Sequence, residues 1–323
     1  MPTFSSFIAE THNNVSPGFV DVLIQTRREE LFTGLMQLRY PTDENLVFAF
    51  VAGVEQQLYR YHEKTTEIIP RPAWHQLVNS PNASVGLLEL PLEALRVIRV
   101  AHEAPVSREE QLTLSSRELI EHANKWLLEA EPSIIHVQGV QLDQMYLLAN
   151  CTNSAVESIA YVDGSVRYSG SAVSLEPNAG ELQVRRYVSA QAHAVWREYE
   201  LRLAFNPLAR LLMKRFGELA GRGLAERLGG QISAWARGGG WNIFFSGENV
   251  TNHQYFDSLE AAVDAYTDIL RCFQDEAGIA VGLRMTENIL LDVLSRLDAN
   301  CRELLLQFIF TRSEGGSLVV RNE

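Results

Sequence analysis

The hydrophobic period changes along the chain, and this change constrains the fold more than any single motif. In SPGFVDVLIQTRREELF apolar residues recur at helical spacing, and Ser16 and Pro17 occupy the positions of an N-cap and a first helical residue. From Gly34 the period becomes two, so that LVFAFV and VEQQLYRY read as strands on either side of Gly53. A helix that ends before Thr33 and leads into an antiparallel meander predicts an α+β fold.

A second β-rich unit is predicted over about residues 134–190. Asp163-Gly164 stands between IAYV and SVRY and is typical of a two-residue hairpin, because a type I′ turn needs positive φ at both central residues. The run SIAYVDGSVRY is similar to NLVFAFVAGVEQQLYRY, since each has an apolar strand, a glycine and an alternating strand ending in Arg-Tyr. A duplicated module explains this similarity, and so does the physics of meanders in general, so both explanations stay open.

Capping signals mark several helices. Ser115 and Glu118 form a capping box in front of ELIEHANKWLLEAE, a helix that Pro132 stops. Asn206-Pro207 is expected to start an amphipathic helix that breaks near Gly221.

Further along the chain, Asp257, followed by Glu260, is expected to cap a helix that Gly278 stops. A last long helix, over about 289–308, has a broad apolar face that favours a homodimer, and the tail SEGGSLVVRNE is expected to fray.

These signals predict three parts. Residues 1–105 form an N-terminal α/β module, residues 106–195 a linker helix and a second β-containing unit, and residues 196–323 a mainly helical C-terminal domain. The polar run after the helical segment PLEALRVIRVA places a linker or boundary near 103–113.

The composition excludes several classes of function. A formal charge of −12 and a pI near 5.2 argue against the broad basic surface that nucleic-acid binding needs. No apolar run reaches the roughly 18 residues of a membrane span, and the N-terminus does not resemble a signal peptide, so we expect a cytoplasmic location without membrane insertion. Three dispersed cysteines without a C-x-x-C spacing predict neither a disulfide framework nor a zinc site, and we expect no metal and no cofactor.

Motifs of catalysis are missing as well, so no catalytic residue is predicted. There is no P-loop, no dinucleotide fingerprint and no Gly-x-Ser-x-Gly elbow. His62-Glu63 and His102-Glu103 lack the second histidine of a zincin and are interpreted as surface pairs. The five tryptophans are dispersed and are interpreted as packing residues of the core or of domain interfaces rather than as a base-stacking platform.

Charge is distributed unevenly in the C-terminal part. The stretch from Arg202 to Arg237 contains seven basic and two acidic residues, which gives it a local charge of +5. The candidate docking residues for an acidic partner are Arg210, Lys214, Arg215, Arg222 and Arg237, although pairing within the chain or simple solvation explains the same charges. Glu260, Asp264 and Asp268 follow each other at i, i+4 and i+8, which suits a hard cation or a basic partner but is more typical of a solvated helix face.

The stretch RGGGWNIFFSGENVTNH, which starts at Arg237, is interpreted as a helix stop followed by a strand and a turn. The glycines supply the left-handed backbone of a helix C-terminus, and Trp241, Ile243 and Phe245 alternate as one strand face. Arg237 and His253 are the two residues of this stretch with a candidate functional role.

One resemblance to a known family is present. In LFTGLMQLRYPTDENLVFAFVAGVEQQL, the matching residues are Thr33, Gly34, Leu35, Gln37, Leu38, Val47, Phe48, Phe50 and Gly53. This run of about 40 residues, with the helix before it, resembles the PATAN-type (DUF4388) module of bacterial signalling proteins, although the turn here is longer and contains proline. The resemblance implies a non-catalytic adaptor module and supplies no catalytic residue.

We therefore expect a non-catalytic bacterial regulatory or adaptor protein that acts through protein–protein interaction, in a two-component or motility-type signalling pathway. Two alternatives stay open. One is a small-molecule sensor with its ligand between the two β-containing units or under Trp241, and the other is an enzyme of unrecognised class whose residues come from distant segments.

Overall fold

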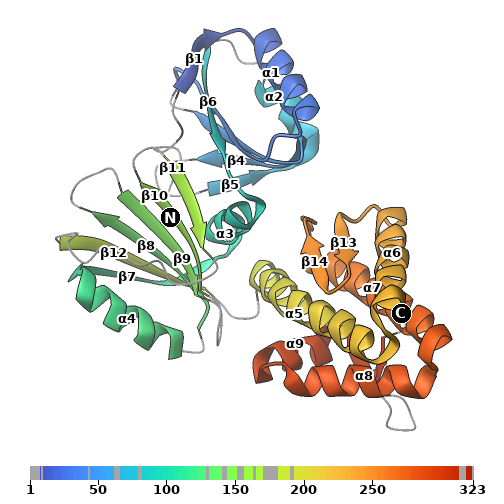
Figure 1. Ribbon diagram of the computed structural model, residues 1–323. Coiled ribbons are helices and arrows are strands. Elements are labelled where there is room, and N and C mark those ends of the chain that lie inside the picture. The colour runs from blue at the N-terminus through green and yellow to red at the C-terminus, as the bar shows by residue number, and fades with distance from the viewer. Residues whose placement is uncertain are drawn as a thin grey trace. The chain divides into compact units, whose positions relative to one another are not determined.

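In the computed structural model the chain divides into two compact units, Met1–His193 and Ala194–Glu323 (Figure 1). The structure describes residues 8, 10–42, 44–61, 66–78, 82–128, 131–139, 144–150, 156–162, 165–169, 181–189, 193–312 and 318–321. Antiparallel sheets dominate the first unit and helices dominate the second. The predicted α+β class with a mainly helical C-terminal region is confirmed.

Two six-stranded sheets form the described framework of the first unit. The elements of its first half are β1 (Glu10–Val15), α1 (Pro17–Glu29), β2 (Gly34–Arg39), β3 (Asn45–Val51), β4 (Val54–Tyr61), β5 (Thr66–Ile69), a 3-10 turn (Arg71–Ala73), α2 (Trp74–Val78), β6 (Ala83–Glu89) and α3 (Leu92–Glu103). The elements of its second half are β7 (Val106–Ser115), α4 (Ser116–Leu128), β8 (Ser133–Gly139), β9 (Gln144–Asn150), β10 (Val156–Val162), β11 (Ser165–Ser169) and β12 (Glu181–Ser189).

The two sheets have the same topology. Their strand orders are β1-β6-β2-β3-β4-β5 and β7-β12-β8-β9-β10-β11, with antiparallel pairing throughout. In each sheet a strand and a helix precede a four-strand meander, and a last strand pairs between the first strand and the meander. The hairpin β10–β11 therefore corresponds to β4–β5, whereas its sequence is similar to that of β3–β4. The two sheets therefore repeat one topology, but the two similar sequence segments lie on strands that do not correspond in it. The segments are offset by one strand.

The first sheet is buried on both faces. Val20 and Leu23 of α1 belong to one hydrophobic cluster with Met36, Phe48 and Leu58, which are cross-strand neighbours on β2, β3 and β4. On the opposite face lies α3, which hydrogen-bonds to β4 and also contacts β9 and β10 of the second sheet. Since α3 packs against strands of both sheets, even the side chains of Arg96, Arg99 and His102 are buried.

The second sheet corrects one expectation from the sequence. The segment expected to be a linker near 103–113 is mostly the strand β7, which pairs with β12 along its whole length. Its residues are polar and largely exposed because β7 is the edge strand of the sheet. A linker at this place was wrong, because a polar edge strand has the composition of a loop. The sequence also allowed a boundary here, and the second sheet begins at Val106.

The second unit packs its helices around α5. Its described elements are α5 (Ala194–Ala220), α6 (Arg222–Gly238), β13 (Ile243–Ser246), β14 (Asn249–Asn252), α7 (Leu259–Val281), α8 (Leu283–Arg296), α9 (Ala299–Phe308), β15 (Phe310–Arg312) and β16 (Leu318–Val320). α5 contacts α6, α7, α8 and α9, and all five helices contribute to one hydrophobic core. At its centre Phe205 of α5 stacks on Tyr266 of α7, with ring centroids 4.0 Å apart.

Several local predictions are confirmed. The Ser16 side chain accepts a hydrogen bond from the Phe19 amide at the start of α1. The amide of Ser115 donates to the Glu118 carboxylate over 2.8 Å, and the amide of Glu118 approaches the Ser115 hydroxyl oxygen, which is the predicted capping box. The chain also breaks at Gly221, where φ is 93°.

Other predictions about the second unit were wrong. α5 does not start at Asn206-Pro207, because it begins at Ala194 and passes through Pro207, which lies exposed while Phe205 and Leu208 on the other side are fully buried. Packing of that apolar face outweighs the lost hydrogen bond. The N-cap of α7 is Ser258, whose side chain accepts from the Ala261 amide, instead of Asp257.

The ends of the later helices also differ from the prediction. α7 continues past Gly278 to Val281 and stops at Gly282, where φ is 89°. The last helix is split into α8 and α9, because Asp298 caps a new helix by accepting from the amides of Asn300 and Cys301. Part of the expected frayed tail pairs as β16 with β15, while residues 313–317 and 322–323 lie outside the described part of the chain.

Candidate functional site

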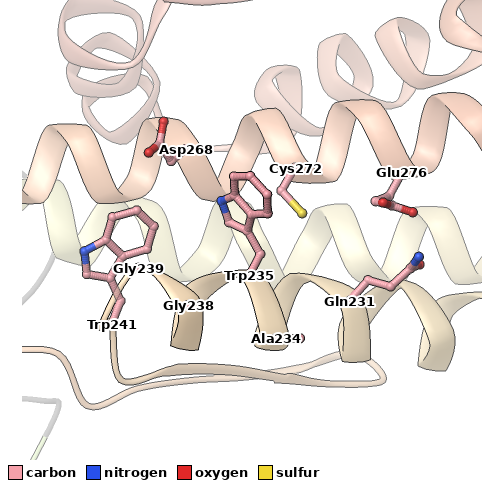
Figure 2. Close-up of a pocket in the computed structure, with 9 residues that line it drawn as sticks. All are labelled: Gln231, Ala234, Trp235, Gly238, Gly239, Trp241, Asp268, Cys272 and Glu276. Atoms are coloured by element: carbon pink, nitrogen blue, oxygen red, sulfur yellow. The ribbon is translucent and has the colours of Figure 1, made fainter.

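A groove between α6 and α7 is the feature of the second unit that is best suited to binding. The two helices pack side by side and leave a hollow of about 680 Å³ (Figure 2). Its lining residues are Gln231, Ala234, Trp235, Gly238, Gly239, Trp241, Asp268, Cys272 and Glu276. In Figure 2, Trp235 rises from α6 toward α7, and Trp241 stands at one end of the groove beyond the last turn of α6. We call this hollow the wide end of the groove.

The hollow exists because the lining residues around Trp235 and just before Trp241 are small. Ala234, Gly238 and Gly239 form the floor there, and a Cβ on Gly239 would approach the Trp241 ring to 3.0 Å. The helix then ends in a Schellman turn, in which the Trp241 amide donates to the Ala236 carbonyl over 2.8 Å.

Gly240 closes this turn with a φ of 78°, and its amide donates to the Arg237 carbonyl. The turn reverses the chain and thereby places Trp241 on the rim. The predicted glycine stop of this helix is confirmed.

The hairpin β13–β14 holds the end of α6 in place. The buried Ser233 hydroxyl receives a hydrogen bond from the Phe245 amide over 2.8 Å and lies 2.7 Å from the Gly229 carbonyl, to which it donates. Gly229 allows this close approach, because a Cβ there would lie 3.2 Å from the Phe245 carbonyl oxygen. On β14, the side-chain amide of Asn252 donates to the Tyr266 hydroxyl of α7 and to the side-chain carbonyl of Asn206 on α5. Both walls of the groove are thus fixed to the core of the unit.

Polar groups of the lining come mainly from α7. Asp268 pairs with Arg271 over 3.0 Å, whereas Glu276 makes no hydrogen bond or ion pair within the described residues. Cys272 lies between these two carboxylates, and burial, together with Glu276 and Asp275, raises its pKa to about 11. At neutral pH Cys272 is therefore a thiol and not a nucleophilic thiolate.

A second, narrower hollow of about 140 Å³ continues the groove. It shares Gln231 and Glu276 with the wide end, and its other lining residues are Phe216, Leu224, Arg227, Leu228, Ile279 and Ala280. Ile279 is 83% exposed and Leu224 is 41% exposed, so the apolar lining of this narrow end reaches solvent. The two hollows together follow α6 from Leu224 to Gly239, which is about 22 Å at 1.5 Å per residue.

The candidate docking residues do not line the wide end, and the structure does not gather them into one cluster. Arg215 bridges helices by pairing with Asp292 of α8, and Arg222 pairs with Glu226 of its own helix. The remaining candidates, Arg210, Lys214 and Arg237, are exposed. Arg222 and Arg237 are separated by about 22 Å along α6. Docking of an acidic partner on these residues stays a prediction.

Some residues of the groove were missed by sequence reasoning. The carboxylate row Glu260, Asp264 and Asp268 was noted, but Glu276, eight residues beyond Asp268 on α7, was not. Trp235 was expected to pack in a core or at a domain interface; it is not a core residue, because it is 56% exposed. Trp241, named from the sequence as a place for a ligand, does line the groove. His253 is exposed and belongs to neither hollow.

The prediction for one of the two histidine–glutamate pairs was wrong. His102 and Glu103 are not a surface pair, because both side chains lie buried at the end of α3. Tyr61 hydrogen-bonds to His102 with 3.1 Å between Oη and Nε2, Tyr59 donates to Glu103 over 2.9 Å, and Arg99 pairs with Glu103. These partners satisfy the buried charges, so the cluster joins α3 to the first sheet.

Residues 62–65, which contain the His62-Glu63 pair, lie outside the described chain, and so does the Asp163-Gly164 turn. The strands β10 and β11 on either side of that turn pair as the sequence predicts.

Among the residues that the structure describes, no three His, Cys, Asp or Glu side chains are placed to hold a metal ion together. No helix in the described ranges is long and apolar enough to cross a membrane. No protein-family model, no curated protein and no solved structure matches the chain.

Proposed function

We propose that the chain is a non-catalytic bacterial regulatory or adaptor protein, and that the groove between α6 and α7 is its docking site for a helix of a protein partner. The length and the lining of the groove support this proposal. At about 22 Å, the groove matches an amphipathic helix of four turns, whose apolar residues recur at i, i+3, i+4 and i+7. The signalling pathway, of the two-component or motility type, follows from the PATAN resemblance of the first unit.

The exposed apolar residues at the narrow end favour a protein partner over a metabolite. Ile279 and Leu224 extend the lining beyond the hollow that a small molecule would fill, and exposed apolar side chains that adjoin a groove are typical of an interaction surface. The groove is also rigidly supported, since Ser233 and Asn252 tie both of its helices to the core.

A photo-crosslinking experiment tests the proposal in the native host. A benzophenone amino acid replaces Ile279 in the full chain, and a matched variant carries it at Leu291, which is 51% exposed on α8 and lies in neither hollow. We expect the first variant to crosslink to a helical segment of one partner, identified by mass spectrometry, and the second variant not to crosslink to it. Ile279→Glu should abolish that interaction. Crosslinks of equal yield at both positions, or none at Ile279, would contradict the proposal.

A small-molecule sensor is the second candidate, favoured by one observation. The hollow beneath Trp241 has about 680 Å³, within the usual range of roughly 300–1,000 Å³ for ligand pockets. A ligand bound only to the folded state would raise the melting temperature, and Trp235→Leu would remove the shift. If nucleotides and metabolites leave the melting temperature unchanged, the sensor function is refuted.

A further inference from the structure

The wide end of the groove combines aromatic rings with negative charge. Two indole rings and two carboxylates line it, and no basic side chain of the described residues does. Asp268 shares its charge with Arg271, but Glu276 has no hydrogen-bonding or ionic partner in the described chain. Burial and the carboxylates of Glu276 and Asp275 raise the pKa of Cys272, which stands between Asp268 and Glu276.

The two carboxylates are too far apart to share a metal ion. Asp268 and Glu276 are eight residues apart on α7, which is about 12 Å along the helix axis. A hard cation needs several oxygen ligands at roughly 2.0–2.6 Å. Two separate positive groups joined by an apolar body fit this spacing better.

We propose that the groove selects a partner helix carrying two basic residues about two turns apart, which meet Asp268 and Glu276 while the apolar face of the helix packs on Trp235 and Trp241. This inference rests on the proposed function and names the chemistry of the partner. Residues seven apart on a helix lie on one face and are separated by about 10 Å, so a pair of lysines or arginines at that spacing reaches both carboxylates.

Charge provides specificity here more than affinity. Partly exposed ion pairs contribute little each, and salt screens them, so a helix with the right apolar face but the wrong charges would still bind weakly. Correct placement of the two basic residues should tighten binding about fivefold at low salt, and the gain should shrink as salt is added.

Two model peptides test the inference on the full chain. Both are helical, have fifteen residues and share one composition with a leucine face; the first carries lysines seven residues apart beside that face, and the second carries them on the opposite face. Binding is followed through the ¹⁵N-labelled indole signals of Trp235 and Trp241. We expect the first peptide to bind about fivefold more tightly than the second. The difference should vanish in Glu276→Gln and persist in Asp264→Asn, an exposed carboxylate of α7 outside the lining.

The other outcomes separate this inference from the proposed function. If both peptides bind equally and Ile279→Glu weakens both, helix docking stands and the charge selection is overturned. If neither peptide shifts the indole signals, the inference is overturned as well. Spermidine is tested in parallel, because it places amines at a similar spacing without a helix. If spermidine alone binds, and does so through Glu276, a polyamine site replaces the docking helix.

Discussion

Replacing Ser233 with alanine should loosen the hairpin that supports the groove. In the structure the Ser233 hydroxyl is the hydrogen-bond acceptor for the buried Phe245 amide, at 2.8 Å. In β13–β14 the Phe245 and Val250 pair lies next to the Ser246 and Asn249 pair that closes the two-residue turn. The Phe245 amide therefore points away from β14, where no strand accepts its hydrogen bond.

The magnitude follows from leaving one buried donor unpaired. Removing one partner of a buried hydrogen bond costs about 1–3 kcal/mol, so Ser233→Ala should destabilise the α6–hairpin contact by about 2 kcal/mol. The alanine leaves no second unpaired group, because the Gly229 carbonyl loses the hydroxyl but lies inside α6, where the backbone amide of residue 233 remains its donor. A loss of about 2 kcal/mol corresponds to roughly thirtyfold more frequent opening.

Hydrogen exchange measures this opening directly. The amides of Phe245 and its strand neighbours in the full chain should exchange about thirtyfold faster in Ser233→Ala. Ser295→Ala is the matched control, since that exposed hydroxyl bonds the Asp292 carbonyl of its own helix, and its removal should change stability by less than about 0.5 kcal/mol. Unchanged protection of Phe245 in Ser233→Ala, or equal effects of the two substitutions, would refute the reasoning.

Three further predictions follow from the structure. Gly240→Ala should cost about 1–2 kcal/mol in thermal or urea unfolding, because its φ is 78°, whereas Gly230→Ala in the exposed, open interior of α6 should stabilise by up to about 1 kcal/mol; equal effects would contradict this assignment. Burial and the neighbouring Arg185 lower the pKa of His136 to about 4, below its ordinary value near 6.5, so the unfolded chain binds the extra proton first. Stability of the first unit should therefore fall by up to about 3 kcal/mol as pH drops from 6.5 to 4, and His136→Gln should flatten this slope in urea titrations. Cys272, with a pKa of about 11, should react with iodoacetamide at pH 8 on the order of a hundredfold more slowly than a free thiol, as mass spectrometry of the alkylated peptide would show; a rate like that of free cysteine would contradict it.

The dimer predicted through the last helix was based on a broad apolar face of that helix, and this face is not exposed. Its apolar residues, including Ile289, Leu290 and Leu305, are buried in the core of the second unit. Leu291 and Leu306 are the exposed large apolar side chains left on α8 and α9 beyond the first turn of α8. The mass of the protein in solution at micromolar concentration, by light scattering, tests the dimer itself.

The sequence by itself determined the features that depend on residues close in the chain. The Ser16 cap, the Ser115 and Glu118 box and the Gly240 turn each depend on hydrogen bonds that span at most five residues, so residue types at fixed offsets sufficed to predict them. The strand period also predicted the meander and the hairpin on either side of the turn at residues 163–164. The class of fold followed from these elements together.

The candidate site was accessible from the sequence only in part. Trp241 and the strand after it were predicted from the alternation of apolar residues, but the exposure of Trp235 depends on which face of α6 meets α7. That orientation is set by the packing of α6 against α7, two segments about 40 residues apart in the chain. The helical period of the sequence predicts which residues share one face of α6, but it does not predict which element packs against that face.

Only the tertiary structure decided which elements meet and which charges are buried. His102 has a polar, helix-terminal context in the sequence, yet it is buried because Tyr61, 41 residues earlier, lies across from it on β4. β7 is a strand because β12, more than 60 residues later, pairs with it. The shared strand order of the two sheets likewise comes from inserting the last strand between earlier ones. Such long-range pairings are selected by the burial of whole faces, which no short stretch of sequence specifies.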